Sequence, residues 1–342
     1  MLTSEKVKGC KSSFVLENNH LTMTAQLKPK LPFSFANNES PVMQPCIPTP
    51  DYVTQFAEYF RQHDVHSMVY EDILWVEDRH VIFPHGPVSH DYMITREGVQ
   101  SLLTQSRDGL LVLCTSGLND TNVTGDWYAV ICRRWESLAD LSANTRSKVR
   151  RGLRNNDVRK VDAQCIVDLG YETHKCASAR YGVTAKTEAY FKESMLVAAD
   201  FANIIDFWGV FHEGSMVGYA QVHVFDDIEA NYSAVVLHPG FFKVYTSYAL
   251  VHAMNEYYLH DRAYSYVNDG FRSILHPTEF QELLINKFGF ERVSVKLRIH
   301  YKPYLAVMMS APKVFRRIVG RIDRRFAALN TLHEAAAEHH WA

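Results

Sequence analysis

IDFWGVFHEGSMVGYAQVHVFDDIEANYSAVVL, residues 205–237, is the stretch that decides the fold. It holds three apolar runs, at residues 205–212, 216–224 and 229–237. Short segments that contain Glu213-Gly214 and Asp226-Asp227 separate these runs, and pairs of this kind favour tight turns. The pattern therefore predicts three consecutive strands that form an antiparallel meander.

The segments around the meander continue an alternation of helices and strands. Residues 245–260 and 278–288 have helical patterns, whereas residues 263–267 and 291–300 have strand-like patterns. Before the meander we expect a helix within residues 136–155, a strand near 163–168, and helical residues from 170 to 199 with a break near Gly182. The predicted fold class is α/β (α+β), with a mixed sheet flanked by helices.

The remaining chain suggests four regions. Residues 1–50 contain many Asn and Pro and are expected to form an extended arm. Residues 51–135 begin with a helix near Asp51 and contain short apolar runs at 109–115 and 127–132, so they form an N-terminal α/β part. Residues 136–310 form the main domain. Residues 311–342 form a helical tail whose apolar stripe faces away from its basic side chains.

Composition excludes several classes of protein. The 342 residues are 47% hydrophobic and 12% aromatic with a net charge of -2, which does not fit a disordered chain. The sequence contains no apolar run long enough for a transmembrane helix. The six cysteines form no CxxC pair, so no metal site is expected. Because the first residues lack an apolar leader, we expect a cytoplasmic protein.

The junction after the third predicted strand carries a recognisable motif. Residues 236–250 read VLHPGFFKVYTSYAL. This segment resembles the pattern VxPxxRxxGxGxAL of the GNAT acyltransferases, with Pro239 and Ala249-Leu250 in place. Tyr245 and Ser247 stand where the family has its two glycines. Those glycines let the backbone approach the pyrophosphate of coenzyme A at a helix N-terminus, so Tyr245 is expected to reshape that cradle.

A second set of motifs is similar to the Fem-type aminoacyltransferases, a branch with two tandem GNAT-like halves. Residues 138–153 read LADLSANTRSKVRRGL, close to the family pattern LSxxxRxxIRRAxK. The family segments that follow this pattern resemble residues 171–183 and Tyr190-Phe191. The end of the second GNAT-like half resembles residues 268–271 and 280–290. The resemblance spans residues 127–301 and implies that residues 51–135 contain a degenerate first half.

This resemblance implies transfer of an acyl or aminoacyl group to an amine. The donor would be an acyl-CoA or an aminoacyl-tRNA, which makes tRNA a further partner. The acceptor would be an amine of a small molecule or a peptide. Such chemistry needs a positioned amine, a held ester or thioester, and a hydrogen-bond donor for the oxyanion.

Three residues are candidates for catalytic roles, and the resemblance carries over the first of them, Lys287. Lys287 is carried over as the group that faces the donor or the oxyanion, and its alternative is a solvated lysine at a helix C-terminus. Asp269 orients the amine or acts as a base, unless it only forms the turn Asn-Asp-Gly. Tyr232 is expected to line the acceptor cleft, on the same strand face as Glu229, or simply to belong to the sheet.

The donor is expected to meet the 239–250 loop and a basic helix. In the loop, Lys243, Tyr245, Thr246 and Ser247 are the candidate contacts, with the two hydroxyls also able to cap the helix. In the basic stretch of residues 146–160, Arg146 and Arg150 are candidates for binding phosphate. A solvated helix face is the alternative for this stretch.

Two other classes of function fit the same features. Tyr245 in place of glycine fits a GNAT-like binding module without catalysis. The basic stretch and the basic tail fit a protein that binds tRNA or another RNA.

Overall fold

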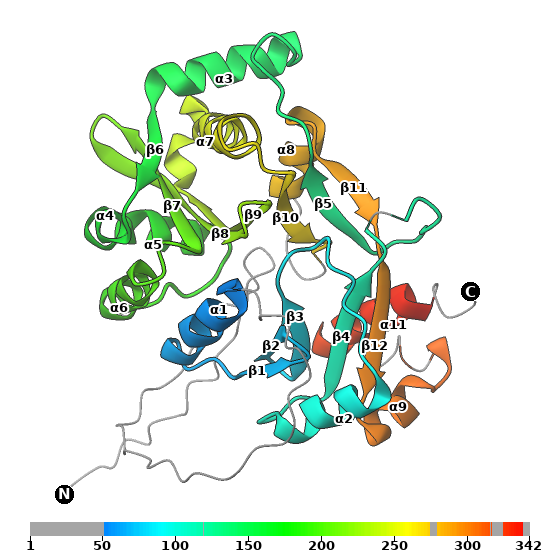
Figure 1. Ribbon diagram of the computed structural model, residues 1–342. Coiled ribbons are helices and arrows are strands. Elements are labelled where there is room, and N and C mark those ends of the chain that lie inside the picture. Colours follow the sequence, from blue (N-terminus) through cyan, green and yellow to red (C-terminus); the bar gives the residue numbers. More distant parts are fainter. Residues whose placement is uncertain (1–50, 119, 274–278, 315, 317–323, 338–342) are drawn as a thin grey trace, which may run out of the picture.

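The computed structural model describes residues 51–118, 120–273, 279–314, 316 and 324–337. Two mixed sheets organise this part of the chain (Figure 1). The smaller sheet has the order β1-β2-β3-β4-β12 and the larger has the order β11-β5-β10-β9-β8-β7-β6. The predicted fold class is therefore confirmed, because helices flank both mixed sheets.

The bounds of the elements are as follows. The strands of the smaller sheet are β1 (Ser67–Tyr70), β2 (Ile73–Asp78), β3 (Val81–His85), β4 (Leu111–Ser116) and β12 (Lys296–Tyr301). Those of the larger sheet are β5 (Tyr128–Cys132), β6 (Asp157–Val161), β7 (Ile205–His212), β8 (Ser215–Phe225), β9 (Glu229–Leu237), β10 (Tyr266–Phe271) and β11 (Glu291–Ser294). The helices are α1 (Asp51–Gln62), α2 (Arg96–Gln105), α3 (Ala143–Asn155), α4 (Ala163–Leu169), α5 (Tyr171–Arg180), α6 (Glu188–Ala199), the 3-10 helix η1 (Pro239–Val244), α7 (Thr246–Asn255), the π-helix η2 (Glu256–Asp261), α8 (Glu279–Lys287), α9 (Pro303–Met309) and α11 (Arg324–Ala337).

The two sheets repeat one connectivity. In the larger sheet, β7, β8 and β9 form the predicted antiparallel meander, and a crossover through α7 places β10 parallel to β9. In the smaller sheet, β1, β2 and β3 form a second meander, and a crossover through α2 places β4 parallel to β3. The chain therefore has two halves of the same topology.

The halves exchange the strand that completes each sheet. β5 follows β4 in the sequence but pairs antiparallel with β10 and β11 in the larger sheet. β12 follows β11 but pairs antiparallel with β4 in the smaller sheet. The predicted boundary at residues 135 and 136 therefore does not separate the two sheets.

Local capping accounts for where several helices begin. Asp162 Oδ1 accepts a hydrogen bond from the backbone N–H of Cys165 (2.8 Å), which starts α4. Ser142 and Thr187 cap α3 and α6 in the same way. Each such cap stabilises a helix by about 1 kcal/mol. The strand expected at residues 163–168 is wrong for this reason, since the cap at Asp162 turns this apolar run into a helix.

Other differences from the expected elements are local. The helix expected within residues 136–155 begins only at Ala143, after the cap at Ser142. The single strand expected at residues 291–300 is two strands, because Val295 is buried between β11 and β12 as the chain passes from one sheet to the other. The helix expected at residues 245–260 continues from α7 into the π-helix η2.

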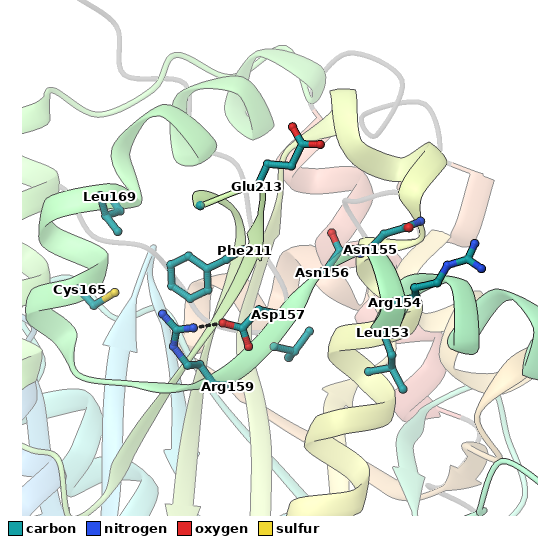
Figure 2. Close-up of a pocket in the computed structure, with 12 residues that line it drawn as sticks. Leu153, Arg154, Asn155, Asn156, Asp157, Arg159, Cys165, Leu169, Phe211 and Glu213 are labelled. Atoms are coloured by element: carbon teal, nitrogen blue, oxygen red, sulfur yellow. Dashed lines mark ion pairs between the residues drawn. The ribbon is translucent and has the colours of Figure 1, made fainter.

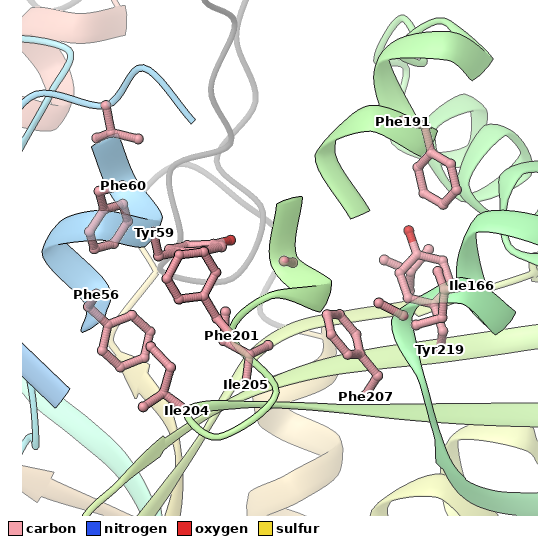
Figure 3. Close-up of a cluster of buried hydrophobic side chains, with 14 of the residues drawn as sticks. Phe56, Tyr59, Phe60, Ile166, Phe191, Phe201, Ile204, Ile205, Phe207 and Tyr219 are labelled. Carbon is pink, nitrogen blue, oxygen red and sulfur yellow. The ribbon is translucent and has the colours of Figure 1, made fainter. Parts of the chain in front are cut away.

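Helices cover both faces of the larger sheet. On one face an aromatic cluster joins α1, α4 and α6 to β7 and β8, with Phe56 and Phe207 among its buried members (Figure 3). On the other face α7 and α8 pack over Tyr232 and Val267. Truncating a buried aromatic side chain of this size to Ala typically costs about 3–5 kcal/mol.

The tail docks on the smaller sheet. Phe326 and Leu329 pack in the cluster that contains Leu297 and Ile299 of β12. The other members of the predicted apolar stripe, Phe315, Ile318, Val319 and Ile322, lie outside the described residues, as do the side chains of Arg317, Arg321, Arg324 and Arg325.

The strand exchange predicts that the halves do not fold separately. A fragment of residues 136–342 lacks β5, so β10 and β11 lose a common antiparallel partner. We expect no cooperative thermal transition for this fragment when it is followed by circular dichroism. A fragment of residues 51–342 keeps both exchanged strands and is the matched control. Cooperative unfolding of the shorter fragment would contradict the prediction.

Candidate functional site

β9 and β10 separate soon after they meet. They pair in parallel only at Tyr266–Glu229, Val267–Ala230 and Asn268–Asn231. Beyond this point β9 continues to Leu237, while β10 pairs with β5. A register shift between Asn268 and Phe271 and a φ of +69° at Gly270 mark a β-bulge where the strands part. Bulges of this kind bend a strand and redirect its side chains, often beside active sites.

A buried polar network holds this branching point. The Asn268 side chain donates to Glu229 Oε1 (2.7 Å) and accepts from Asn231 Nδ2 (2.8 Å) and from the Gly270 N–H (2.9 Å). Both oxygens of Glu229 also accept from the backbone N–H of Val88, at 3.0 and 2.9 Å. Burial raises the pKa of Glu229 to about 7, although these hydrogen bonds oppose the shift. The network therefore ties the smaller half to the point where β9 and β10 diverge.

Asp269 lies in the bulge itself and is 2% exposed. Burial raises the pKa of its carboxyl to about 8, and the side chain of Gln281 on α8 lowers it in part. The same Gln281 amide donates to the backbone oxygens of Asp269 (3.3 Å) and Phe271 (3.1 Å). Burial therefore favours the protonated form of the Asp269 carboxyl at the divergence of the two strands.

Tyr232 does not lie beside Glu229 on one strand face. The two positions differ by an odd number, and successive side chains of a strand point to opposite faces. Glu229 bonds to Val88, while Tyr232 is buried under α7 with its hydroxyl donating to Asn255 Oδ1 (2.7 Å). The shared face expected from the sequence is wrong, and the structure gives Tyr232 a place in the core.

The loop before α7 is closed by α3. Tyr245 is the N-cap of α7 and has a left-handed backbone, with φ 61° and ψ 39°. A Cβ on Gly152 of α3 would lie 2.7 Å from the Tyr245 carbonyl oxygen, so only glycine permits this approach. The Asn156 side chain donates to the Val244 carbonyl (3.0 Å) and to that of Gly152 (2.8 Å). These contacts hold η1 and the start of α7 against the end of α3.

Thr246 and Ser247 do not cap α7. Tyr245 occupies the N-cap position, and no side-chain hydrogen bond caps the helix. Thr246 is fully buried, and its Oγ1 has no hydrogen-bond partner within the described residues. The expected cap is wrong because the helix begins one residue after the left-handed tyrosine.

The cations near α7 are not those that the sequence singled out. Lys148 Nζ lies 3.3 Å from the Tyr248 hydroxyl and over the same ring at 5.2 Å. The Arg151 guanidinium lies over the Tyr245 ring at 5.0 Å. Both belong to the basic stretch of residues 146–160, and an interval of three residues places them on one side of α3. We name Lys148, Arg151, Tyr245 and Tyr248 the α3–α7 cluster.

The predicted donor-binding residues lie around this cluster. Arg146 Nη1 donates to the Ala139 carbonyl (3.2 Å), Arg150 is exposed on α3, and Lys243 is exposed on η1. Lys287 is half-buried at the end of α8. The next residue, Phe288, has its ring 5.7 Å from Tyr248. The structure thus brings the end of α8 to the start of α7, whereas Arg146 is turned toward its own loop.

Arg180 spans the two sides of the divergence. Its Nη2 lies 2.7 Å from Glu279 Oε2 at the start of α8, and its guanidinium lies 4.7 Å from the ring centre of Phe242 on η1. η1 follows β9, and α8 follows β10. Arg180 therefore links the segments that follow the separated strands. The motif at residues 171–183 includes Arg180 but does not indicate these contacts.

A groove of about 700 Å³ lies elsewhere, along the edge strand β6 (Figure 2). It touches the loop before α7 only through Asn156, and none of the predicted site residues lines it. Its walls are formed by Leu153, Arg154, Asn155, Asn156, Asp157, Val158, Arg159, Cys165, Leu169, Phe211, Glu213 and Gly214.

The raised pKa of Asp269 predicts that the stability of the protein depends on pH. Its pKa is about 8 in the folded protein and near 4 when unfolded, so the folded state holds an extra proton between these values. The free energy of unfolding should therefore fall as pH rises from 4 to 8, by at most about 1.4 kcal/mol per pH unit from this group.

The Asp269→Asn variant should lose this part of the pH dependence in urea unfolding at several pH values. Glu193→Gln, at an exposed position of α6, is the control. Parallel pH curves for wild type and Asp269→Asn would contradict the raised pKa.

The described residues contain neither a cluster of metal ligands nor a membrane-spanning helix. No group of three or more His, Cys, Asp or Glu side chains there is placed to hold a metal ion. Among the described helices, none combines the length and hydropathy needed to cross a bilayer.

The chain is similar to several solved structures. No family model matches the chain, and no curated protein matches its sequence. Among solved structures, the chain is similar to that of FemX, with 11% identity and a TM-score of 0.48 over 75% of this chain and 93% of the other. It is also similar to the C-terminal domain of a putative lysylphosphatidylglycerol synthetase from Agrobacterium fabrum, with 12% identity and a TM-score of 0.47 over 74% and 90% of the two chains. A tandem GNAT protein from the clavulanic acid biosynthesis pathway gives 11% identity and a TM-score of 0.39 over 67% and 78%. By their names, one of these neighbours is FemX and another is a tandem GNAT protein.

Proposed function

We propose that this chain is an N-acyltransferase that joins an acyl or aminoacyl group to the amine of a small molecule or peptide. The observation that carries the proposal is the divergence of β9 and β10 beside Asp269, a buried carboxyl with a pKa of about 8. The motif at residues 236–250 supports the same reading.

The reaction needs one proton to move. The amine nitrogen attacks the donor carbonyl, a C–N bond forms, and the C–S or C–O bond to the leaving group breaks. The amine loses a proton and the leaving thiolate or alkoxide gains one. A carboxyl with a pKa near the working pH suits this exchange, and we assign it to Asp269. Lys287 is proposed to stabilise the oxyanion or the donor.

The donor is proposed to bind at the α3–α7 cluster. An acyl-CoA and an aminoacyl-tRNA both carry phosphates, and Lys148 and Arg151 bring two cations to the N-terminus of α7. A helix N-terminus attracts anions through its free N–H groups and its dipole. Tyr245 and the close contact of Gly152 narrow the space for the donor phosphates at the start of α7, where a glycine pair would leave it open.

Titration calorimetry with coenzyme A, acetyl-CoA and an aminoacyl-tRNA tests the donor. Binding of coenzyme A at micromolar strength supports an acyl-CoA enzyme, and binding of the charged tRNA alone supports the aminoacyl donor. If none binds, the enzyme proposal fails. The contacts that close the loop before α7 then favour the second candidate function, a GNAT-like binding module without catalysis.

Replacement of single cations tests the site. Because charge-assisted contacts are worth about 1.5–3 kcal/mol, Arg151→Ala should weaken donor binding about tenfold or more, whereas Arg150→Ala, on the exposed side of α3, should change it little.

Lys287→Ala should lower turnover about a hundredfold. Lys175→Ala, at an exposed site on α5, is the matched control. Equal effects of Arg150→Ala and Arg151→Ala, or an unchanged rate for Lys287→Ala, would remove those residues from the site.

A further inference from the structure

The segment at residues 303–314 is unusually apolar for a surface. It reads PYLAVMMSAPKV, in which Ser310 and Lys313 are the only polar residues apart from the hydroxyl of Tyr304. Residues 303–309 of this segment form α9, which has no charged side chain on any face. Helices that are apolar all round normally lie inside a protein or against an apolar partner.

Only one face of α9 is covered by the protein itself. Leu305 and Met309 are buried in the cluster formed with β12 and α11. The opposite face carries Tyr304, Val307 and Met308, which are 62%, 73% and 40% exposed. Spacings of three and four residues place these side chains on one side of the helix. Val314, 71% exposed, lies five residues beyond the end of α9.

We name Tyr304, Val307, Met308 and Val314 the α9 surface. Single exposed apolar residues need no explanation, but a group on one face usually marks an interaction site. Val69 on β1, by contrast, stands apart in the sequence from the other exposed large apolar residues. Figure 1 shows α9 at the outer end of β12, away from α7 and α8.

We propose that the α9 surface binds the surface of an anionic phospholipid bilayer. Its apolar side chains would enter the boundary between head groups and acyl chains. The charge of the adjoining sequence supports an anionic partner, since residues 302–325 contain seven Lys and Arg against the single acid Asp323. Each Lys or Arg that lies close to the membrane surface adds about 1 kcal/mol of attraction to an anionic leaflet.

The described contacts keep part of this charge near α9. Arg316 Nη1 donates to the Met309 carbonyl (2.9 Å), and its Nε donates to Asn330 Oδ1 (2.8 Å). Lys313 is paired with Glu334 at 2.9 Å, which offsets one positive charge. A second copy of the chain is a poorer partner than lipid, because a two-fold contact would bring the same basic segments together. This proposal does not depend on the proposed enzymatic activity.

Vesicle flotation with the full chain tests the proposal. We expect binding to vesicles of phosphatidylcholine with phosphatidylglycerol, weaker binding to phosphatidylcholine alone, and loss of binding at high salt. Val307→Asp should reduce the partition coefficient at least about tenfold, because it removes an exposed apolar side chain that would enter the bilayer and adds a charge of the same sign as the lipid head groups. Tyr304→Ser is a second, milder variant. Val69→Asp, at a position 51% exposed, is the matched control and should bind as wild type does.

Three outcomes would overturn the proposal. The first is an absence of binding to either vesicle. The second is equal binding by wild type and Val307→Asp, or equal binding to both lipid compositions. The third is a dimer in gel filtration that Val307→Asp converts to a monomer, which would make the α9 surface a contact between copies of this chain.

Discussion

The exchange of β5 and β12 between the two sheets is the constraint on which the rest of the structure depends. Each sheet is completed by a strand whose sequence neighbour lies in the other sheet. Removal of either strand exposes the edge of β10 or β4, a row of unpaired backbone groups. The two halves therefore stabilise each other through main-chain hydrogen bonds as well as through side-chain packing.

The exchange also explains why the candidate site lies where it does. β10 has β5 as an antiparallel partner beyond Asn268, so it follows β5 rather than β9. The parting of the strands leaves buried polar groups that need partners, since each one left unsatisfied would cost about 1–3 kcal/mol. Asn268 meets this need by bonding Glu229, Asn231 and Gly270 together. Glu229 in turn reaches Val88, so the position of the smaller half and the shape of the divergence are set by one network.

The sequence predicted the local features and missed the long-range ones. The meander at residues 205–237 followed from turn pairs and apolar runs, which are local signals. Glu291–Ser294 and Lys296–Tyr301 looked like one strand, because nothing near Val295 indicates that the chain changes sheets there. At the site, the motif identified the loop before α7 and the position of Tyr245. Lys148 and Arg151 belong to the basic stretch of residues 146–160, but the sequence did not show that these two cations meet α7, because that contact depends on the packing of α3 against α7.

Tyr245 shows how the chain accommodates a side chain where the motif that it resembles has glycine, and this bears on the proposed donor site. A residue with a Cβ in the left-handed region costs roughly 1–2 kcal/mol, and such strain persists only where the surroundings fix the backbone. Here Gly152 lies against the Tyr245 carbonyl, Asn156 bonds to the carbonyl before it, and Arg151 covers its ring. The backbone thus keeps the turn that a glycine would make, while the space beside it is taken by an aromatic ring and a cation. A phosphate at the start of α7 would then contact cationic side chains as well as backbone N–H groups, and this depends on α3, which the loop motif alone does not include.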